Sequence, residues 1–231
     1  MAVRENVGIF DVSHMGRMLI TGTDSERFLN LLVPRDLSKT AVGRASYTFM
    51  LNEKGGFKDD VVFERLAEDK FLLVWNAGNL HKIPTWMESN LSPDYEVKLN
   101  NISRNSAMFA LQGPKARDVL SEIVKDELPK SWSLLETKIK DIDVIISGTG
   151  YTGESGFEII VFNTTIEDPS NALIVWESLI KESSIEVKPC GLGARDSLRL
   201  EAGYPLYGND IHENIDPISA DLFFPPFVHM T

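Results

Sequence analysis

The strongest constraint on the fold is a recurring order of predicted elements. A strand, a glycine, an amphipathic helix and a hairpin with a glycine-rich turn follow one another twice along the 231 residues. The first strand-like run and its helix lie at 17–21 and 24–33, and the second run, at 108–111, precedes a helix with the same apolar spacing. This recurrence predicts an internal duplication of two α+β halves. Chance repetition of common β-β-α patterns is the alternative.

The duplication divides the chain into three parts. We expect a first half at 1–100, a second half at 101–220 and a divergent tail at 221–231. Each half contains one glycine-rich hairpin turn, at 52–56 and at 150–156, because paired glycines supply the positive φ that such turns need. If a pseudo-twofold axis relates the halves, the two turns face each other, and such a junction is a natural place for a cavity.

Charge and cysteine content narrow the classes of function. The 34 acidic and 23 basic residues give a net charge of −11, which argues against a nucleic-acid partner because phosphate binding needs surplus cations. The single cysteine, Cys190, excludes an internal disulfide and a thiolate metal cluster. No apolar run approaches the roughly 20 residues that cross a bilayer, and the start of the chain does not resemble a secretory signal. We expect a soluble cytoplasmic protein without a membrane partner.

Two adjacent acids begin the strand after the first turn. Asp is depleted in strands, yet Asp59 and Asp60 stand side by side there, and alternation directs one of them toward whatever lies behind the hairpin. Asp60 shares its face with the apolar Val62, so we expect Asp60 to be the inward acid. An inward carboxylate is unfavourable unless it is paired or bound to a ligand. Two solvated acids at a turn are the alternative.

The second hairpin and the segment after it carry two further candidates. Glu158 lies in the otherwise apolar strand predicted at 157–162, where it either faces water or binds a ligand. Arg195 stands in the first turn of a helix predicted from about Ala194 to Gly203, where a cation opposes the helix dipole. It has either a binding partner or a surface ion pair. Two acids on related hairpins, with no accompanying histidine cluster, favour a nitrogenous ligand that is uncharged or cationic over a metal.

Five segments stand in order along the chain. They are AVRENVGIFDVSHMG from Ala2, YTFMLNEKGGFKDDVVF from Tyr47, QGPKA from Gln112, TGYTGESGFE from Thr149 and KPCGLGARDSLRLEAGYPLYGNDI from Lys188. Together they resemble the motifs of one known family, the aminomethyltransferases, or T-proteins, of the glycine cleavage system. The resemblance covers nearly the whole chain, to about Asp216, and its last segment is the most specific.

The resemblance implies a reaction and its participants. In this family the methylene of an aminomethyl group, carried on the lipoyl arm of the H-protein, passes to tetrahydrofolate with release of ammonia. Tetrahydrofolate is therefore the expected co-substrate and lipoylated H-protein the expected partner. Asp60 matches the family's catalytic acid, which orients or tunes the folate nitrogens. The positions that match the family's folate contacts are Tyr47, Val62, Asn76, Glu158, Arg195 and Tyr204.

The resemblance also sets the expected fold. It implies the duplicated α+β folate-binding domain, without the C-terminal β-barrel that follows it in the family, and a chain truncated at both ends. Two positions depart from the pattern. Ser131-Trp132 stands where relatives often carry a tyrosine pair, and Glu64 stands where they frequently carry tyrosine.

Other functions on the same fold stay open. One is a non-catalytic folate-binding protein of the kind that assists iron–sulfur cluster maintenance, and another is a folate-dependent demethylase. The former carries a cysteine-containing lysine–glycine motif where this chain reads GLGARDSLRLEAG from Gly191, which favours the enzyme. A structural domain that has lost its ligand is the third alternative, and the joint presence of Asp60, Glu158 and Arg195 argues against it.

Overall fold

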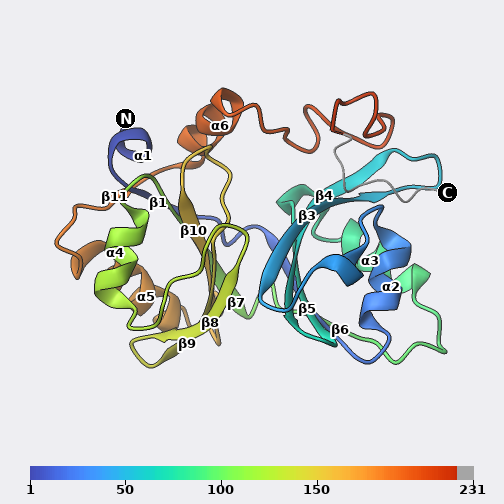
Figure 1. Ribbon diagram of the computed structural model, residues 1–231, viewed down its shortest axis with the longest axis horizontal. Coiled ribbons are helices and arrows are strands. Elements are labelled where there is room, and N and C mark those ends of the chain that lie inside the picture. The colour runs from blue at the N-terminus through green and yellow to red at the C-terminus, as the bar shows by residue number, and fades with distance from the viewer. Residues whose placement is uncertain (223–231) are drawn as a thin grey trace. The chain divides into compact units, whose positions relative to one another are not determined.

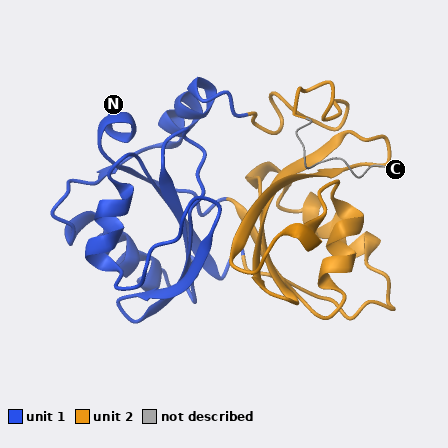
Figure 2. Ribbon diagram, viewed as in Figure 1, with its two compact units in different colours: residues 1–14, 103–204 blue, residues 15–102, 205–231 orange. Residues whose placement is uncertain are grey.

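The computed structural model describes residues 1–222 and contains two compact units, each built from two chain segments (Figure 1, Figure 2). Unit 1 comprises residues 1–14 and 103–204, and unit 2 comprises residues 15–102 and the segment from Pro205. The units differ from the predicted halves because the first strand of the chain pairs within unit 1. Of the predicted tail, only Asp221 and Leu222 lie within the described residues.

Unit 1 contains a six-stranded sheet of order β11-β1-β7-β10-β9-β8. Neighbouring strands of this sheet are antiparallel except β1 and β11, which are parallel. The strands are β1 (Gly8–Asp11), β7 (Ser106–Gln112), β8 (Leu134–Ile139), β9 (Ile142–Ser147), β10 (Gly156–Phe162) and β11 (Lys188–Pro189). The helices are α1 (Ala2–Glu5), α4 (Ala116–Ile123), α5 (Ser170–Lys181) and α6 (Leu192–Glu201).

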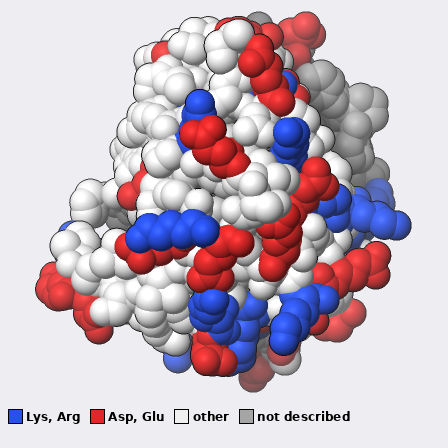
Figure 3. All heavy atoms as spheres, turned by 90° about the vertical axis from the view of Figure 1, so that its left-hand side faces the viewer, with Lys and Arg blue, Asp and Glu red and all other residues white. Residues whose placement is uncertain are grey.

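Acidic and basic side chains are interspersed over the face shown in Figure 3. Unit 1 contains several exposed ion pairs, such as Lys140–Glu182 at 2.6 Å and Lys138–Asp143 at 2.9 Å. Exposed pairs of this kind contribute little to stability, because water and salt screen them. The apolar core is therefore the main source of stability for this unit.

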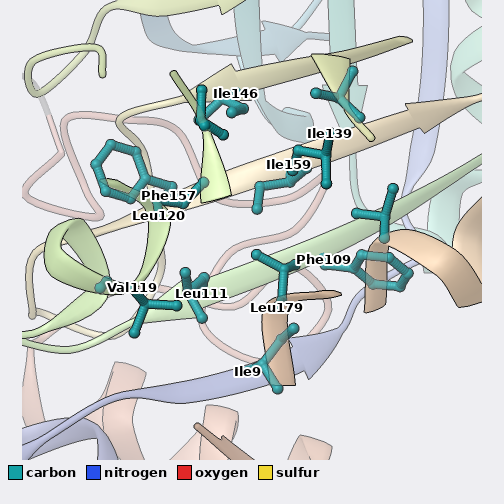
Figure 4. Packing of buried hydrophobic residues seen from close by; sticks show 14 of the residues in the cluster. Ile9, Phe109, Leu111, Val119, Leu120, Ile139, Ile146, Phe157, Ile159 and Leu179 are labelled. Atoms are coloured by element: carbon teal, nitrogen blue, oxygen red, sulfur yellow. The ribbon is translucent and has the colours of Figure 1, made fainter. Parts of the chain in front are cut away.

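The core of unit 1 lies between one face of the sheet and helices α4 and α5 (Figure 4). Alternate residues of β10, Phe157 and Ile159, point into it, and so do Phe109 and Leu111 of β7. The helices contribute apolar stripes at helical spacing, with Val119 and Leu120 from α4 and Val175 and Leu179 from α5. Because side chains alternate along a strand, Glu158 lies on the sheet face opposite these helices.

Unit 2 contains a five-stranded antiparallel sheet of order β3-β4-β5-β2-β6. Its strands are β2 (Gly16–Thr21), β3 (Arg44–Leu51), β4 (Phe57–Ala67), β5 (Lys70–Trp75) and β6 (Lys98–Asn101). Its helices are α2 (Ser25–Leu32) and α3 (Lys82–Asn90), with short 3-10 turns η1 (Leu37–Lys39) and η2 (Ala77–Asn79). The buried cluster on one sheet face includes Phe28 and Leu29 of α2, Met87 of α3, and Phe63 and Trp75 of the sheet.

The residue pattern also predicts one strand at 138–147 and another at 95–99, and the structure differs at both. The run predicted as one strand at 138–147 is a hairpin of β8 and β9, which turns at Lys140 with φ of 54°. No glycine or proline marks this turn, so the sequence pattern contained no sign of it. The strand predicted at 95–99 starts later, at Lys98, because Tyr95 instead packs against Phe28 with ring centroids 6.4 Å apart.

Candidate functional site

The adjacent acids of β4 point to opposite faces of the sheet. Asp59 is 0% exposed and shares its face with Val61 and Phe63 of the core, whereas Asp60 is half-buried on the other face with Val62. The expectation that Asp60 is the acid facing the core is therefore wrong. Both faces of β4 carry apolar residues, so the alternation of side chains did not by itself show which of the two acids faces the core.

The side-chain amide of Asn76 joins both acids. Asn76 directly follows β5, and β5 pairs with β4 so that Trp75 lies opposite Val61. Its Nδ2 donates to Oδ1 of Asp59 and to Oδ1 of Asp60, each at 2.7 Å. Its backbone N–H donates to Oδ2 of Asp59 at 3.1 Å. The position of Asn76 is thus fixed by the strand pairing and by the two carboxyl groups.

Tyr47 of β3 contacts Asp60 from the other side. It lies opposite Val62 in the β3–β4 register, and its hydroxyl donates to Oδ2 of Asp60 at 3.0 Å. Its ring packs edge-on against Phe49 at a centroid distance of 5.3 Å. The structure therefore brings together the four residues of unit 2 that the resemblance marked: Asp60, Tyr47, Val62 and Asn76. We call these residues and Asp59 the acid cluster.

Asp59 and Asn79 also belong to the surroundings of Asp60, although the motifs in the sequence did not mark either residue. Asn79 is buried in η2, where its Nδ2 donates to the carbonyl oxygen of Lys58 at 3.2 Å and its own carbonyl oxygen accepts from Nε1 of Trp75 at 3.1 Å. The adjacency of two acids at a strand start was the available signal for Asp59. For Asn79 the sequence held no such signal, because an asparagine in a turn is common.

The surroundings of the acid cluster raise the pKa of both acids. Burial raises the pKa of Asp59 to about 7, and the neighbouring charge of Asp60 adds to this effect. Burial also raises the pKa of Asp60 to about 6, against hydrogen bonds from Tyr47 and Asn76 that favour its charged form. Carboxyl groups with such pKa values can exchange protons near neutral pH, as general acid–base catalysis requires.

We predict that removing the Asp59 carboxyl group makes the protein relatively more stable as pH rises. In the folded protein its pKa is about 7 against an ordinary 3.8, so the folded state binds more protons between these values. Stability from this group is present below about pH 4 and is lost as pH rises through about 7. Urea unfolding at pH 5 and pH 8 should show Asp59→Asn gaining about 2 kcal/mol relative to the native protein. The exposed control Asp69→Asn should show no such change, and a pH-independent difference for Asp59→Asn would contradict the prediction.

The glycine-rich turn of unit 1 is built around Gln112. This residue of β7 is fully buried, and its Nε2 donates to the carbonyl oxygen of Thr149 at 3.1 Å while its Oε1 accepts from Oγ1 of Thr152 at 2.8 Å. A Cβ atom on Gly150 would lie 2.0 Å from Oε1 of Gln112, and one on Gly156 would lie 2.6 Å from its Nε2. The turn needs glycine at these positions because the Gln112 side chain occupies the space.

Glu158 leaves the turn on the sheet face that the helices do not cover. It is half-buried between Phe157 and Ile159, which both point into the core. The hydroxyl of Thr149 donates to its Oε2 at 2.6 Å. One carboxylate oxygen is thus held by the turn, and a carboxylate has further acceptor positions for a ligand.

Arg195 and two tyrosines stack in unit 1. The guanidinium of Arg195 lies 4.8 Å from the ring centroid of Tyr151, which stacks on Tyr204 at 5.8 Å and 26°. Burial lowers the pKa of Arg195, and the charge of Glu158 opposes this effect. Its Nη1 is buried without a hydrogen-bond partner among the described residues, and the structure shows no ion pair of Arg195 there. We call Glu158, Arg195, Tyr151 and Tyr204 the arginine cluster.

Arg4 holds together the elements that carry the arginine cluster. Its Nη1 donates to the carbonyl oxygen of Thr152 in the turn at 2.6 Å, and its Nη2 pairs with Oε2 of Glu201 at the end of α6 at 2.7 Å. Arg195 is carried by α6 and Tyr151 by the turn. Arg4 therefore fixes the distance between them, a role that the sequence alone did not indicate.

The two positions that depart from the family pattern lie in different units. Trp132 adopts a left-handed φ of 57°, and its N–H donates to the carbonyl oxygen of Gly148 at 3.0 Å. Gly148 directly precedes Thr149, so Trp132 lies beside the turn that leads to Glu158. Glu64 is buried in β4, on the same strand face as Asp60.

Within residues 1–222 there is no group of three or more His, Cys, Asp or Glu side chains that could hold a metal ion. Among these same residues, every helix is too short or too polar to cross a bilayer.

Comparison with known proteins identifies relatives over nearly the whole chain. The family described as GCVT N-terminal domain matches residues 1–230. An aminomethyltransferase of Thermotoga maritima is 41% identical over 225 residues, which cover 96% of this chain and 60% of that protein. One from Thermosipho melanesiensis is 42% identical over 224 residues, which cover 96% of this chain and 59% of that protein. This chain therefore spans about 60% of the length of these relatives.

Solved structures agree with the sequence relatives. The glycine cleavage system aminomethyltransferase T from Bartonella henselae superposes with a TM-score of 0.83 and 36% identity, over 95% of this chain and 57% of that one. A heterotetrameric sarcosine oxidase from a Corynebacterium shares the fold alone, with a TM-score of 0.54 and 18% identity. The predicted α+β fold is thereby confirmed. The chain belongs to the GCVT N-terminal domain family, the aminomethyltransferase family that its motifs predicted.

Proposed function

We propose that this chain is the tetrahydrofolate-binding part of an aminomethyltransferase of the glycine cleavage system. The observation that carries the proposal is the state of Asp60. Its half-buried carboxyl group is held by Tyr47 and Asn76, and its pKa is raised to about 6. Such a group is mostly ionised at neutral pH yet accepts a proton readily, as a residue that acts on a folate nitrogen must.

Asp60 has a defined task in the proposed reaction. The carbon–nitrogen and carbon–sulfur bonds of the aminomethyl group break, and two bonds from the methylene to two folate nitrogens replace them. Each folate nitrogen gives up one proton: one leaves with the amine as ammonia, and the other leaves the lipoyl sulfur as a thiol. As a folate nitrogen forms its new bond, it becomes positively charged and loses a proton. The carboxylate of Asp60 stabilises this charge and accepts or relays the proton. Tyr47 and Asn76 hold both oxygens of the carboxylate while this happens.

The arginine cluster suits recognition of the folate. A pterin ring is flat and has ring nitrogens and an amino group that donate hydrogen bonds, and the carboxylate of Glu158 offers acceptors for them. Nη1 of Arg195, which has no hydrogen-bond partner among residues 1–222, offers a donor to a carbonyl or carboxylate oxygen of the ligand. A buried donor without a partner costs about 1–3 kcal/mol, and bound ligand would remove that cost. Tyr204 adds an aromatic face.

The partners of the whole reaction are part of the same proposal. The two sequence relatives described above are named aminomethyltransferases, and this chain spans about 60% of their length. We propose lipoylated H-protein as the donor of the aminomethyl group and tetrahydrofolate as the acceptor. Val62 lies beside Tyr47 in the β3–β4 register and is proposed as an apolar contact of the folate.

We predict that the native chain binds 5-methyltetrahydrofolate, a form of the co-substrate that cannot receive a methylene. Calorimetric titration should give saturable heat with a stoichiometry of about one. Asp69→Asn, which removes an exposed acid of unit 2, is the matched control and should bind equally well. Absence of heat at about 1 mM ligand would refute the binding proposal for this chain.

Transfer is tested separately from binding. The native chain is mixed with aminomethyl-loaded H-protein and tetrahydrofolate, and ammonia and methylenetetrahydrofolate are measured together. Equal amounts of both products support the enzyme. Folate binding without either product would instead favour a non-catalytic folate-binding protein on the same fold.

A further inference from the structure

Asp59 accepts hydrogen bonds on both of its carboxylate oxygens in the acid cluster. Its Oδ1 accepts from Nδ2 of Asn76 at 2.7 Å and from the backbone N–H of Asp60 at 3.1 Å, and its Oδ2 accepts from the backbone N–H of Asn76 at 3.1 Å. The residue is 0% exposed. A buried carboxyl group in an apolar core is costly, so hydrogen bonds to both oxygens are needed to keep it there.

The hydrogen bonds of Asn76 connect this buried group to Asp60. A side-chain amide nitrogen has two hydrogens. Nδ2 of Asn76 donates to Oδ1 of Asp59 and to Oδ1 of Asp60 at the same distance, 2.7 Å, and more weakly to the backbone carbonyl oxygen of Asp60 at 3.2 Å. The Asp59 carboxyl group is therefore one of the two close acceptors that orient the Asn76 amide, and the amide in turn holds one oxygen of Asp60.

The main chain around Asn76 is held in place by its neighbours. It is the residue between β5 and the 3-10 turn η2. Asn79 of that turn is tied to β4 through the carbonyl oxygen of Lys58 and to β5 through the indole of Trp75. The main chain at Asn76 is thus fixed, and its side-chain amide is oriented chiefly by the two carboxyl groups at 2.7 Å, with the carbonyl oxygen of Asp60 further away at 3.2 Å.

We propose that Asp59 is a positioning residue for methylene transfer, which orients the Asn76 amide and through it fixes the carboxyl group of Asp60. This inference rests on the proposed function of Asp60. Asp59 itself lies on the core face of β4 and is fully buried, so it acts on Asp60 and not on the substrate.

Asparagine at position 59 separates this role from simple packing. It has nearly the shape of aspartate, but it offers one carbonyl oxygen and an NH2 group in place of two acceptor oxygens. Asn76 donates to both oxygens of Asp59, so one of its two donors would face the new NH2 group. The amide would reorient and Asp60 would lose a fixed partner, while the core would keep its volume.

The kinetic test compares the native chain, Asp59→Asn, Asn76→Ala and the double variant, with Asp69→Asn as the control. We expect Asp59→Asn to lower kcat about 30-fold and to change KM for tetrahydrofolate less than about threefold, because the loss falls on the reacting step. The double variant should be no slower than Asn76→Ala, since Asp59 acts through that residue. A kcat for Asp59→Asn equal to that of the control, or effects that multiply in the double variant, would overturn the proposal.

A second measurement does not depend on turnover. In protein labelled with 13C at the aspartate carboxyl carbons, the Asp60 signal is identified by its loss in Asp60→Asn. In native protein we expect it to shift in two coupled steps with pH, and in Asp59→Asn in one step. An unchanged titration in Asp59→Asn would overturn the proposal. If Asp59→Asn does not fold, the Asp59 signal is followed in Asp60→Asn instead. The pKa of Asp59 should fall in that variant. An unshifted pKa of Asp59 would also overturn the proposal.

The two proposals fail in different ways. A native chain that binds folate but forms no methylenetetrahydrofolate refutes the proposed enzyme, whatever the variants do. Native turnover combined with an unaffected Asp59→Asn variant refutes only the role of Asp59.

Discussion

Replacement of Asp60 by asparagine is expected to lower the rate of methylene transfer at least about a thousandfold. Asparagine cannot accept the proton that leaves the folate nitrogen, and it cannot stabilise the positive charge that forms there. Its carbonyl oxygen can still accept a hydrogen bond from Tyr47 or Asn76, so the shape of the acid cluster is largely kept. Affinity for 5-methyltetrahydrofolate should therefore change less than about tenfold, or roughly 1.4 kcal/mol.

Single-turnover transfer and calorimetric titration of the same preparation give both quantities. Asp69→Asn, an exposed acid beyond the end of β4, controls for loss of one negative charge in unit 2. Undiminished transfer by Asp60→Asn would rule out its catalytic role. A loss of affinity as large as the loss of rate would instead assign Asp60 to binding alone.

Replacement of Arg195 by methionine is expected to weaken binding of 5-methyltetrahydrofolate at least about 100-fold. Methionine keeps an unbranched apolar side chain and removes the guanidinium, which lies over Tyr151 and whose Nη1 is buried without a partner in the part of the chain that the structure describes. Because burial already disfavours the charged form, as the lowered pKa of Arg195 indicates, the unliganded protein should keep its stability or gain about 1 kcal/mol.

Arg27→Met is the matched control for this substitution. Arg27 also lies over a tyrosine ring, that of Tyr95, at 4.9 Å, but it is exposed and belongs to the outside of α2. Its replacement should leave ligand affinity unchanged. Equal affinities of native protein and Arg195→Met would remove Arg195 from the proposed folate site, and a large loss of stability would show that it supports the fold instead.

Changes in stability distinguish binding residues from structural ones. Replacing a binding residue should keep or raise the stability of the unliganded protein, whereas replacing a structural residue should lower it. Residues that serve a ligand often reduce the stability of the unliganded protein, because they hold charge or unpaired donors in buried places. Asp59 and Arg195 are both ionisable groups whose charged form burial disfavours. Gln112 and Arg4 satisfy their hydrogen bonds within the protein, so their replacement should reduce stability whether or not ligand is present.

Local patterns in the sequence predicted most elements and the candidate residues. Helical spacing placed α2 and α4, and short apolar runs placed β2 and β10, because these patterns depend on neighbours in the chain. The unusual acids at 59–60 and Glu158 were visible as polar residues in apolar strands. The order of the motifs identified the family, and the comparisons confirmed it.

The sequence by itself thus determined the family, the α+β fold class and the residues worth testing. Only the tertiary structure decided that Asp59 and not Asp60 faces the core, that one amide of Asn76 joins both acids, and that Gln112 and Arg4 hold the second turn and α6. The physical reason is the range of the interactions. Propensity and alternation act over a few residues, whereas burial, and the hydrogen bonds and pKa values that follow from it, depend on contacts between segments as far apart as Arg4 and Glu201.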